Sequence, residues 1–600
     1  MPSFTPPVRD TRFVLEHVVG LHRYANRPRF EAATPDVVDA VLEEGGRFVA
    51  EVLFPLNQVG DREGCTRHPD GSVTTPTGFK DAYRQFVESG WATLGNAPEF
   101  GGQGMPHVVS TAFQEYMISA NMAFAMYPGL THGAIAALIA KGSPEQQAMY
   151  LPKLVSGEWG GTMNLTEPQC GTDLGLIRTR AEPQADGSYQ LTGTKIFISS
   201  GEHDLTENII HLVLAKTPGA PDSSKGISLF VVPKFIVEAD GSLGARNAVT
   251  CGSIEHKMGI HANSTCVMNY DGATGWLVGE EMKGLAAMFI MMNAARLGVG
   301  LQGLGVAEVA YQNAVTYAQD RRQGRSLTGS KEPAEKADTL FVHPDVRRML
   351  MEAKAYTEGL RALCLWGALQ VDLEESAPDE DERQLAADLI GLLTPVIKGY
   401  GTDLGYLIAT NAQQVYGGHG YVAEWGMEQY VRDARIAMIY EGTNGVQAMD
   451  LVGRKLAQNG GRAVQALFRI VGEEVAAAKG EAATADVAER LGKALGDLQA
   501  ATMWFMTNGM NNPDNVGAGA YSYMELMGAV AIGLMWLRMA RAAATLKVAG
   551  EGDTAFLDAK LVTARFFAER VLPMTGALRR KIEGGAEAVM ALPVEMFMAA

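Results

Sequence analysis

The sequence predicts a mainly α-helical protein with a β domain inserted between helical segments. Apolar residues recur every three or four positions in the first part of the chain, as in TPDVVDAVLEEGGRFVAEVLFPLN (34–57), which is typical of amphipathic helices. From about Gly160 the pattern changes to short alternating stretches rich in β-branched and aromatic residues, such as YQLTGTKIFIS and GISLFVVPKFIV. Helical spacing then returns and continues toward the end of the chain.

These elements divide the chain into five expected segments. Residues 1–35 form an irregular, proline-rich N-terminal arm, and residues 36–160 form an N-terminal helical domain. The alternating stretches, separated by turn residues such as ADGS, place a β domain at 161–275. A helical bundle follows at 276–459, interrupted by the charged linker SKEPAEKADTLFVHP, and an additional C-terminal helical domain occupies 460–600.

Composition and charge disfavour several classes of partner. The chain has 600 residues, 47% of them hydrophobic, so several domains or one large multilayer fold must share the core. A formal net charge of −17 disfavours nucleic acid and anionic membranes as partners. An anionic substrate would therefore need a local basic pocket.

The cysteines and the apolar runs indicate a cytoplasmic protein without a membrane span. The five cysteines are odd in number, scattered and without a CxxC pair, which argues against a disulfide framework or a thiolate metal site. The N-terminus lacks the apolar core of a secretion signal. The run LMGAVAIGLMWL (526–537) ends well short of the roughly 20 residues that a membrane helix needs.

Common cofactor and catalytic motifs are missing or out of context. Gly298, Gly300 and Gly303 match GxGxxG but lie within a helical pattern, so we expect them to let two helices pack closely rather than to bind a dinucleotide. The eleven histidines show no ligand spacing, and no metal site is expected. Neither a GxSxG elbow nor a Walker lysine loop occurs.

Four glycine-rich stretches carry hydroxyl, aromatic or arginine side chains. They are MNLTEPQCGTDLG (163–175), GTKIFISSG (193–201), QDRRQGR (319–325) and QQVYGGHGY (413–421). In the second, strand alternation would place Lys195, Phe197 and Ser199 on one face, with an aromatic plane beside a hydroxyl. Alone, the first stretch is also typical of a plain turn at a domain junction, the second of a core strand, and the third of a solvated helix end.

The stretch IYEGTNG (439–445) places a single carboxylate, Glu441, between a tyrosine and a glycine turn. Thr443 and Asn444 are typical capping residues for the helical pattern VQAMDLVGRKLAQ that follows. Glu441 is therefore expected just before a helix N-terminus. An exposed acid before a helix cap would give the same local pattern.

Together, and in this order, these stretches resemble the acyl-CoA dehydrogenase family. The matching motifs are LTEP..GTD, GxKxFIS, an arginine-rich helix end, QxxGGxGY and IYEGT, between roughly Gly90 and Lys455. The resemblance implies an N-terminal helical domain, a middle β-barrel domain and a C-terminal helical bundle, here followed by an extra helical domain. The arm, the added helices and the length are most similar to the bacterial branch that acts on 3-methylmercaptopropionyl-CoA.

By this resemblance Glu441 is the catalytic base. The α-proton of a thioester is weakly acidic, so a positioned base must remove it while the β-hydride passes to FAD. In the family, the backbone N–H of the glutamate and a ribityl hydroxyl of FAD stabilise the thioester oxygen. Some members carry the base just before the arginine of MNAAR, where this chain has Ala295, so Glu441 is the candidate that remains.

The resemblance also assigns residues to the cofactor and the substrate. The expected FAD contacts are Leu165, Thr166, Thr172, Phe197, Ile198, Ser199, Arg321, Gln414, Gly417, Gly418 and Thr443. The expected substrate contacts are Thr172, Asn293, Arg296, Tyr440 and Gly442. Four of the FAD contacts are expected to reach the cofactor of a neighbouring subunit: Arg321, Gln414, Gly417 and Gly418. Arg296 matches the arginine near the CoA moiety and would be the local basic group that the acidic chain needs.

Three positions depart from the family pattern. The usual RxxFG is one residue short here, so the pyrophosphate arginine is either Arg321 or Arg322. Phe197 replaces the tryptophan that stacks on the flavin. The glutamine usually found four residues after the base is Gly445, which removes one expected contact to FAD.

The resemblance implies an FAD-dependent dehydrogenase that forms a trans-2-enoyl-CoA, expected to be methylthioacryloyl-CoA in dimethylsulfoniopropionate degradation. An electron-transfer flavoprotein is the expected electron acceptor and a homodimer the expected assembly. Alternatives are a fatty acyl-CoA dehydrogenase of another chain length, an acyl-CoA oxidase, and a flavin- and DNA-binding relative without dehydrogenase activity. Met288, Met291 and Met292 would either line an adaptable pocket suited to a thioether or form ordinary core.

Overall fold

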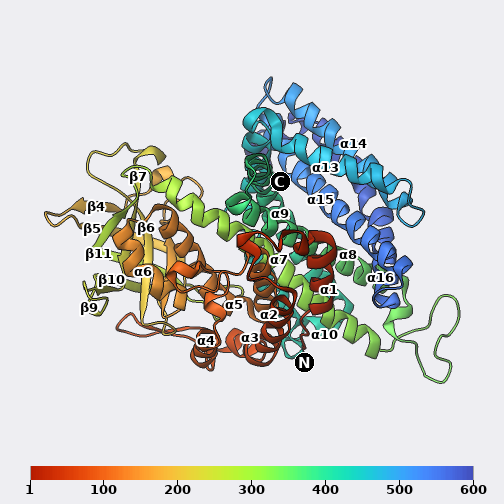
Figure 1. The fold of residues 1–600 in the computed structure, drawn as a ribbon, viewed down its shortest axis with the longest axis horizontal. Coiled ribbons are helices and arrows are strands. Elements are labelled where there is room, and N and C mark those ends of the chain that lie inside the picture. The colour runs from red at the N-terminus through yellow and green to blue at the C-terminus, as the bar shows by residue number, and fades with distance from the viewer. Residues whose placement is uncertain (1, 599–600) are drawn as a thin grey trace. The chain divides into compact units, whose positions relative to one another are not determined.

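The computed structural model describes residues 2–598 (Figure 1). Within these residues the chain forms two compact units. One comprises the chain up to Leu42, the segment Pro106–Glu115 and the chain from Val299 onward, and the other comprises Glu43–Met105 and Tyr116–Gly298. We refer to them as the bundle unit and the barrel unit and describe each by itself.

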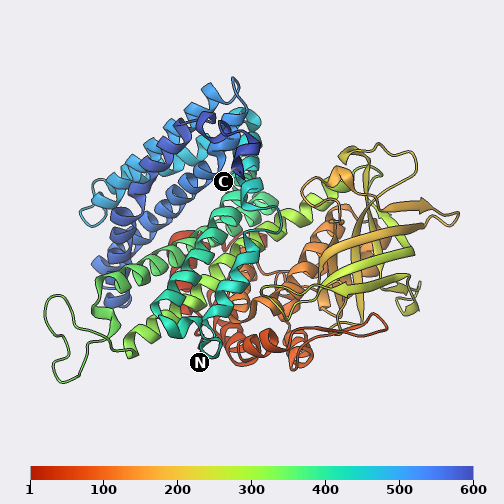
Figure 2. The same ribbon diagram turned by 180° about the vertical axis from the view of Figure 1, so that it is seen from behind.

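The barrel unit contains a closed ring of β-strands, as predicted for the middle of the chain. Strand β5 pairs with β4 and β11, β6 pairs with β4 and β7, and β7 pairs with β11, which closes the ring. Strands β10 and β3 extend it on β11 and β6, and the strands are seen from behind in Figure 2. The strand bounds are β3 (Trp159–Asn164), β4 (Arg180–Pro183), β5 (Tyr189–Ser199), β6 (Asn208–Lys216), β7 (Ile227–Pro233), β10 (Val249–Ile254) and β11 (Thr265–Val278). Shorter strands are β1 (Thr66–Arg67), β2 (Val73–Thr74), β8 (Phe235–Val237) and β9 (Leu243–Arg246).

Alternating side chains of these strands build two separate apolar cores. On β6, Val213 packs with Leu191 and Phe230 in one cluster, whereas Leu212 packs with Leu138 and Trp159 in the other. The second cluster joins the strands to the helices α5 (His107–Lys141), which begins in the bundle unit, and α6 (Pro144–Ser156). The remaining helices that contribute to this unit are α2 (Pro35–Phe48), which begins in the bundle unit, α3 (Pro55–Glu63) and α4 (Phe79–Glu88).

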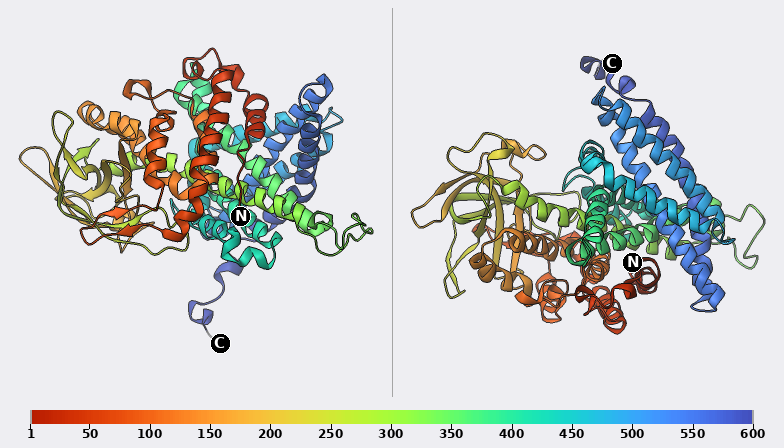
Figure 3. Two further views of the ribbon diagram at one scale, coloured as in Figure 1. Left: turned by 90° about the horizontal axis from the view of Figure 1, so that it is seen from below. Right: turned by 45° about the horizontal axis from the view of Figure 1, so that its top comes forward.

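The bundle unit is built from helices, both long and short, which Figure 3 shows from two further directions. Their bounds are α1 (Val8–Phe13), α7 (Gly284–Asp320), α8 (Pro344–Ser376), α9 (Glu380–Val415), α10 (Gly418–Tyr421), α11 (Met427–Ala437), α12 (Asn444–Asp450), α13 (Arg462–Ala478), α14 (Ala485–Asn508), α15 (Asp514–Ala549), α16 (Thr554–Arg570), α17 (Thr575–Glu583) and α18 (Glu587–Met590). Of these, α7 begins in the barrel unit. The predicted linker, 330–344, is irregular as far as 339, and a short helical turn, Leu340–Val342, then precedes α8.

Glycines allow α7 and α9 to approach closely, which confirms the helix-packing interpretation of the GxGxxG match. A Cβ added to Gly303 would lie 2.5 Å from the carbonyl oxygen of Gly401, and one added to Gly300 would lie 2.5 Å from Ile397. A methyl group at either position cannot be accommodated without a shift of the helices. At Gly298 a Cβ would meet nothing within 4 Å.

We therefore expect opposite effects from the same substitution at two positions of α7. Gly303→Ala should destabilise the protein by about 1–3 kcal/mol, because it overpacks the helix contact. Gly298→Ala should be neutral or stabilise it by up to about 1 kcal/mol, because alanine favours a helix and has room here. The unfolding midpoints of the two variants test this. Equal midpoints would mean that the close helix contact does not limit stability.

Three helices, α5, α7 and α15, are long and apolar enough to cross a membrane by length and composition alone. The expectation that the run 526–537 is too short for a membrane helix is not met, because the run lies inside α15, which has 36 residues. In α15, 83% of the apolar window is buried within the protein. Its side chains pack against helices that include α8, α9, α14 and α16, and this packing explains why the helix is apolar on all sides.

The prediction of an irregular N-terminal arm is wrong. Helix α1 continues into a π-helical segment, Val14–Val19, and its buried residues include Asp10 and Phe13. Asp10 forms ion pairs with Arg361 of α8 and Lys560 of α16. These distant partners explain why the local pattern, interrupted by prolines and charges, does not indicate a packed helix.

Candidate active site

Glu441 lies in the turn between α11 and α12, just before a helix N-terminus as predicted. Thr443 is the N-cap of α12, and its Oγ1 accepts a hydrogen bond from the Val446 N–H at 3.3 Å. Asn444 is the first helical residue rather than a cap. Glu441 has a φ of +56°, a conformation that non-glycine residues adopt only where their surroundings fix it.

Side chains on both sides of Glu441 hold this turn. The Tyr440 hydroxyl donates a hydrogen bond to Oε1 of Gln302 on α7 at 2.5 Å, and Gln447 Nε2 donates to the carbonyl oxygen of Glu441 at 3.1 Å. Burial raises the pKa of Tyr440, so its hydroxyl stays protonated as a donor. At Gly445 a Cβ would meet only Thr443 Oγ1, at 3.9 Å, so packing does not exclude a longer side chain there.

Arg296 and Asn293 lie one turn apart on α7, as their spacing predicts. Arg296 Nη1 approaches Asn293 Oδ1 at 3.4 Å, and the arginine is buried whereas the asparagine is exposed. Two of the nearby methionines, Met288 and Met291, belong to the apolar core of the barrel unit, and Met292 packs against it. Their arrangement agrees with ordinary core, and it gives no support to a thioether pocket.

In the barrel unit, the segment that carries Leu165 and Thr166 is fixed to strand β5. Lys195 Nζ donates to the carbonyl oxygen of Leu165 at 3.0 Å, and the N–H of Ile196 donates to the carbonyl oxygen of Thr166 at 2.9 Å. The first and second glycine-rich stretches therefore lie side by side. Both expected residues of the segment are half-buried.

A buried ion pair that we did not predict, between Lys195 and Glu167, anchors this arrangement. Lys195 Nζ and Glu167 Oε1 are 2.8 Å apart, and both side chains are inaccessible to solvent. The carboxylate also accepts the Arg178 and Thr179 N–H groups and the Thr179 hydroxyl. Burial opposes ionisation, but Lys195 and these donors lower the pKa of Glu167 to about 2. The signal in the sequence was a single lysine in the second stretch and an acid in the first.

The predicted placement of Lys195, Phe197 and Ser199 on one face of β5 is wrong. Lys195 pairs with Met268 and Ile198 pairs with Cys266, so β5 has one extra residue between these pairs. This β-bulge gives Phe197 a φ of +59° and leaves it 59% exposed, whereas Lys195 and Ile198 both point into the protein. The side chain of Ile198, an expected FAD contact, lies in a core cluster.

Thr172 lies in the exposed turn after Gly171. The turn begins with a tight backbone pairing, in which the N–H groups of Glu167 and Cys170 each bond to the carbonyl oxygen of the other at 2.9 and 3.0 Å. The Asp173 side chain then caps a short helical turn by accepting the Gly175 N–H. These hydrogen bonds order the loop without involving the Thr172 hydroxyl. Thr172 is therefore an exposed residue on an ordered loop.

In the bundle unit, an aromatic cluster joins the end of α7 to the glycine turn after α9. Tyr317 stacks on Tyr416 with ring centroids 4.0 Å apart, and its hydroxyl is hydrogen-bonded to His419 Nδ1 at 2.9 Å. His419 in turn stacks on Trp425 at 4.4 Å. The cluster thereby brings two predicted stretches to one end of the bundle. The predicted residues at this place are all exposed: Arg321, Gln414, Gly417 and Gly418.

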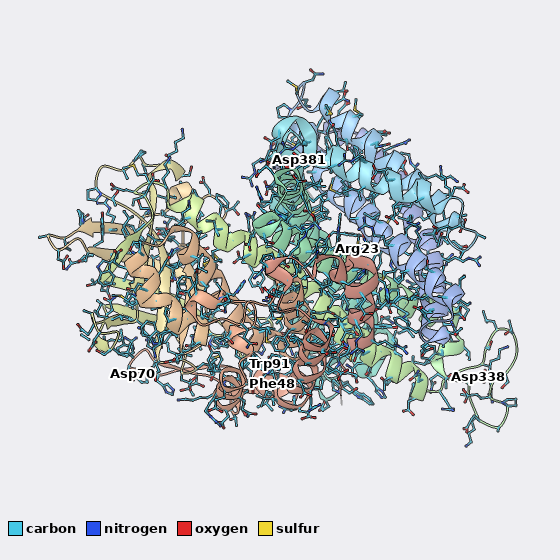
Figure 4. All side chains as sticks on the ribbon, viewed as in Figure 1. Arg23, Phe48, Asp70, Trp91, Asp338 and Asp381 are labelled. Atoms are coloured by element: carbon cyan, nitrogen blue, oxygen red, sulfur yellow. The ribbon has the colours of Figure 1, made fainter. Side chains whose placement is uncertain are left out.

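Acidic residues of the loop after α7 form ion pairs with Arg322 and Arg325 of the stretch QDRRQGR. Asp338, labelled in Figure 4, accepts the Glu332 N–H at 2.8 Å and pairs with Arg325 at 3.1 Å. Arg322 pairs with the Glu332 carboxylate at 2.5 Å. Within residues 2–598, Arg321 makes no side-chain hydrogen bond or ion pair, so its guanidinium remains available to a ligand.

The residues of the barrel unit fit a flavin cofactor. The exposed Phe197 ring, held in a strained conformation by the bulge, offers an aromatic surface that a planar ring system would cover. The Thr166 segment, bonded to β5 beside it, carries a half-buried hydroxyl. Among the described residues, no group of three or more His, Cys, Asp or Glu side chains is arranged to hold a metal ion.

Comparison with known proteins identifies the family. Four family profiles match in chain order: "Acyl-CoA dehydrogenase, N-terminal domain" at 40–158, "Acyl-CoA dehydrogenase, middle domain" at 162–273, "Acyl-CoA dehydrogenase, C-terminal domain" at 282–456, and "Acetyl-CoA dehydrogenase C-terminal like" at 467–593. A 3-methylmercaptopropionyl-CoA dehydrogenase of Ruegeria pomeroyi is 45% identical over 97% of this chain and 98% of the relative. The chain belongs to the acyl-CoA dehydrogenase family.

A second relative supports the family assignment, and two solved structures share the fold of this acyl-CoA dehydrogenase. The broad-specificity linear acyl-CoA dehydrogenase FadE5 of Mycobacterium tuberculosis is 36% identical over 97% of the chain and 98% of the relative. Two solved structures share the fold: Caenorhabditis elegans ACDH-11 in complex with C11-CoA, with a TM-score of 0.78 at 19% identity, and an acyl-CoA dehydrogenase from Bacillus anthracis complexed with FAD, with a TM-score of 0.73 at 21% identity. They cover 98% and 94% of this chain, which covers 95% and 90% of them.

The family fixes the class of chemistry. This acyl-CoA dehydrogenase is an FAD-dependent oxidoreductase that acts on a CH–CH bond. The expected enzyme class, cofactor and fold class are therefore confirmed, including the β domain and the extra C-terminal helices.

Proposed function

We propose that this enzyme dehydrogenates 3-methylmercaptopropionyl-CoA to methylthioacryloyl-CoA, as a step of dimethylsulfoniopropionate degradation. The observation that carries the proposal is the 45% identity with the Ruegeria pomeroyi enzyme over nearly the whole of both chains. The relative named for broad-specificity linear acyl-CoA dehydrogenation is 36% identical. Linear fatty acyl-CoA thioesters are therefore the alternative substrates that a test must include.

Glu441 is the proposed base that takes the α-proton of the thioester. Its backbone conformation is unusual and is held by contacts on both sides, as expected for a group that must keep one position relative to a carbon acid. Tyr440 and Gly442, on either side of the base, are the proposed substrate contacts from this turn. Bound FAD supplies the acceptor for the hydride that leaves the β-carbon.

The remaining proposed contacts follow the placements described above. Arg296, with Asn293 on the same helix face, offers the positive charge near the CoA moiety that a chain of net charge −17 otherwise lacks. Thr172 is proposed to contact both cofactor and substrate. The proposed FAD contacts from the barrel unit are Leu165, Thr166, Thr172, Phe197, Ile198 and Ser199. Those from the bundle unit are Arg321, Gln414, Gly417, Gly418 and Thr443.

The positions of Ile198 and Arg321 in the structure refine the proposed FAD contacts. Because its side chain is buried, Ile198 would reach FAD through its backbone. Arg322 is paired within its own loop and Arg321 is exposed. We therefore assign Arg321 as the arginine that binds a pyrophosphate.

We further propose an electron-transfer flavoprotein as the electron acceptor, a homodimeric assembly and a cytoplasmic location. The exposed Gly417 turn and the Arg321 guanidinium form a surface suited to reaching a neighbouring subunit's cofactor. All five cysteines are free thiols, which agrees with a reducing compartment.

A turnover screen of CoA thioesters tests the proposed substrate. Purified holoenzyme is assayed with 3-methylmercaptopropionyl-CoA and with linear acyl-CoA thioesters of increasing length, using an artificial electron acceptor. We expect the highest kcat/KM for the methylthio substrate. A higher kcat/KM for a linear substrate would overturn the substrate assignment. Stoichiometric peroxide release without the acceptor would instead identify an oxidase.

Removing the buried lysine should weaken FAD binding without removing any group that contacts FAD. In Lys195→Met the Glu167 carboxylate loses its counter-charge, and the Leu165–Thr166 segment loses a fixed bond. We expect purified Lys195→Met to retain less than half of the FAD of the wild type. Lys225→Met, at an exposed position of the same unit, is the control. Equal FAD content in both variants would contradict a positioning role for the pair.

The same ion pair predicts how stability depends on pH. The pKa of Glu167 is lowered from 4.5 to about 2 in the folded protein. Its contribution to stability is therefore present above about pH 4.5 and lost as the pH falls toward 2. Glu167→Gln should flatten the fall of the unfolding midpoint in this window, and an unchanged slope would refute the assignment.

A further inference from the structure

A buried lysine from another helix binds the backbone carbonyl group of Gly442, the residue after Glu441. Lys398 of α9 is inaccessible to solvent. Its Nζ donates to the carbonyl oxygen of Gly442 at 2.7 Å and to Oδ1 of Asn444 at 2.8 Å. The turn that carries Glu441 is therefore fixed to α9, as well as to α7 through Tyr440.

Asn444 extends this contact along α9. It is buried, and its Nδ2 donates to the carbonyl oxygen of Gly399 at 3.0 Å and to Oδ1 of Asp403 at 2.8 Å. Burial raises the pKa of Asp403, and the hydrogen bonds that it accepts oppose this shift. Asp403 thus serves as the acceptor that orients Asn444.

The chain of hydrogen bonds ends in the added C-terminal helices. The Tyr521 hydroxyl of α15 donates to Oδ2 of Asp403 at 2.6 Å. Helix α15 packs closely on α9 at this level: a Cβ on Gly399 would lie 2.2 Å from Sδ of Met524, and one on Gly528 would lie 2.2 Å from the ring of Tyr400. Helix packing therefore sets the backbone from which Tyr521 extends, and the tyrosine itself is 38% exposed.

We propose that Tyr521 is a positioning residue for the catalytic base and acts through Asp403, Asn444 and Lys398. This inference rests on the proposed role of Glu441. A backbone conformation such as that of Glu441, with φ at +56°, persists only where the surroundings over-determine it. The C-terminal helices supply part of that restraint, which gives them a function in the dehydrogenation beyond stabilising the bundle.

The test compares two identical substitutions on one helix. Tyr521→Phe removes the hydroxyl that orients Asp403. Tyr523→Phe removes a hydroxyl that is hydrogen-bonded to Thr502 at 2.7 Å and has no part in this network. Holoenzymes are compared by kcat, KM, FAD content and unfolding midpoint, with the best substrate of the thioester screen.

We expect Tyr521→Phe to lower kcat about 3- to 10-fold, the effect of one lost hydrogen bond. KM, FAD content and unfolding midpoint should stay at wild-type values, and Tyr523→Phe should keep wild-type kcat. In a Glu441→Gln background, Tyr521→Phe should give no additional loss, because both changes act on one group.

Three results would overturn the inference: equal kcat values for the two tyrosine variants, a loss confined to KM or FAD content, or a full additional loss in the Glu441→Gln background. Failure of the proposed role of Glu441 can be distinguished from failure of this inference. It would show as wild-type turnover in the single variant Glu441→Gln. If Glu441→Gln is inactive while Tyr521→Phe matches Tyr523→Phe, only the positioning role is refuted.

Discussion

Glu441→Gln is expected to lower kcat/KM by about 10²- to 10⁴-fold, because the amide cannot accept the α-proton and a positioned general base contributes about that factor. Glutamine has nearly the same shape as glutamate. We therefore expect FAD content and unfolding midpoint to stay at wild-type values. Turnover of the best CoA thioester with an artificial acceptor measures the effect.

A matched control for this substitution lies in the same part of the chain. Glu424, an exposed residue between α10 and α11, is changed to glutamine in the same way and should leave kcat/KM unchanged. If Glu441→Gln loses FAD or stability together with activity, the loss cannot be assigned to proton abstraction.

Arg361→Met is expected to cause the largest loss of stability. The guanidinium is 1% exposed and lies 2.7 Å from Glu115 and 2.5 Å from Glu308, with Asp10 as a third partner. Removing one member of a buried ionic cluster leaves uncompensated charge and typically costs about 3–5 kcal/mol. We expect the midpoint of the calorimetric transition of the bundle unit, which contains Arg361, to fall by more than about 5 °C.

The pH dependence of this loss follows from Glu115. Burial raises the pKa of Glu115 from 4.5 to about 7, even against the attraction of Arg361. A raised carboxylate pKa means that the folded protein holds a proton that the unfolded chain releases between pH 4.5 and 7. Stability therefore decreases as the pH rises through this window. Part of the loss in Arg361→Met should be recovered as the pH is lowered from 7 toward 4.5.

An exposed arginine provides the comparison for Arg361. Arg565 pairs with Glu569 on the surface of α16, with 71% of its side chain exposed. Arg565→Met should leave the calorimetric midpoint unchanged, because exposed pairs contribute little. Equal shifts for the two variants would contradict the special role of the buried cluster.

The features that the sequence predicts correctly depend on local patterns. The helix start beside Glu441 follows from the capping residue Thr443, and the close packing of α7 follows from glycines at regular spacing. The β domain follows from alternation over short stretches. These signals lie within a few residues of the feature that they predict.

The features that the sequence does not predict depend on distant partners. Lys195 and Glu167 are 28 residues apart, and neither motif alone indicates that the two charges meet. The α1 segment is packed through Asp10, whose partners Arg361 and Lys560 lie far along the chain. The bulge at Phe197 defeats strand alternation because one inserted residue reverses the faces that follow it.

The most direct test of Glu441 as the catalytic base is the rate at which substrate bleaches the flavin absorption of the holoenzyme. Wild type and Glu441→Gln, loaded with equal FAD, are mixed anaerobically with saturating 3-methylmercaptopropionyl-CoA. We expect rapid bleaching in the wild type and a rate at least about 10²-fold lower in the variant. Bleaching of the variant at the wild-type rate would contradict the assignment of Glu441 as the base.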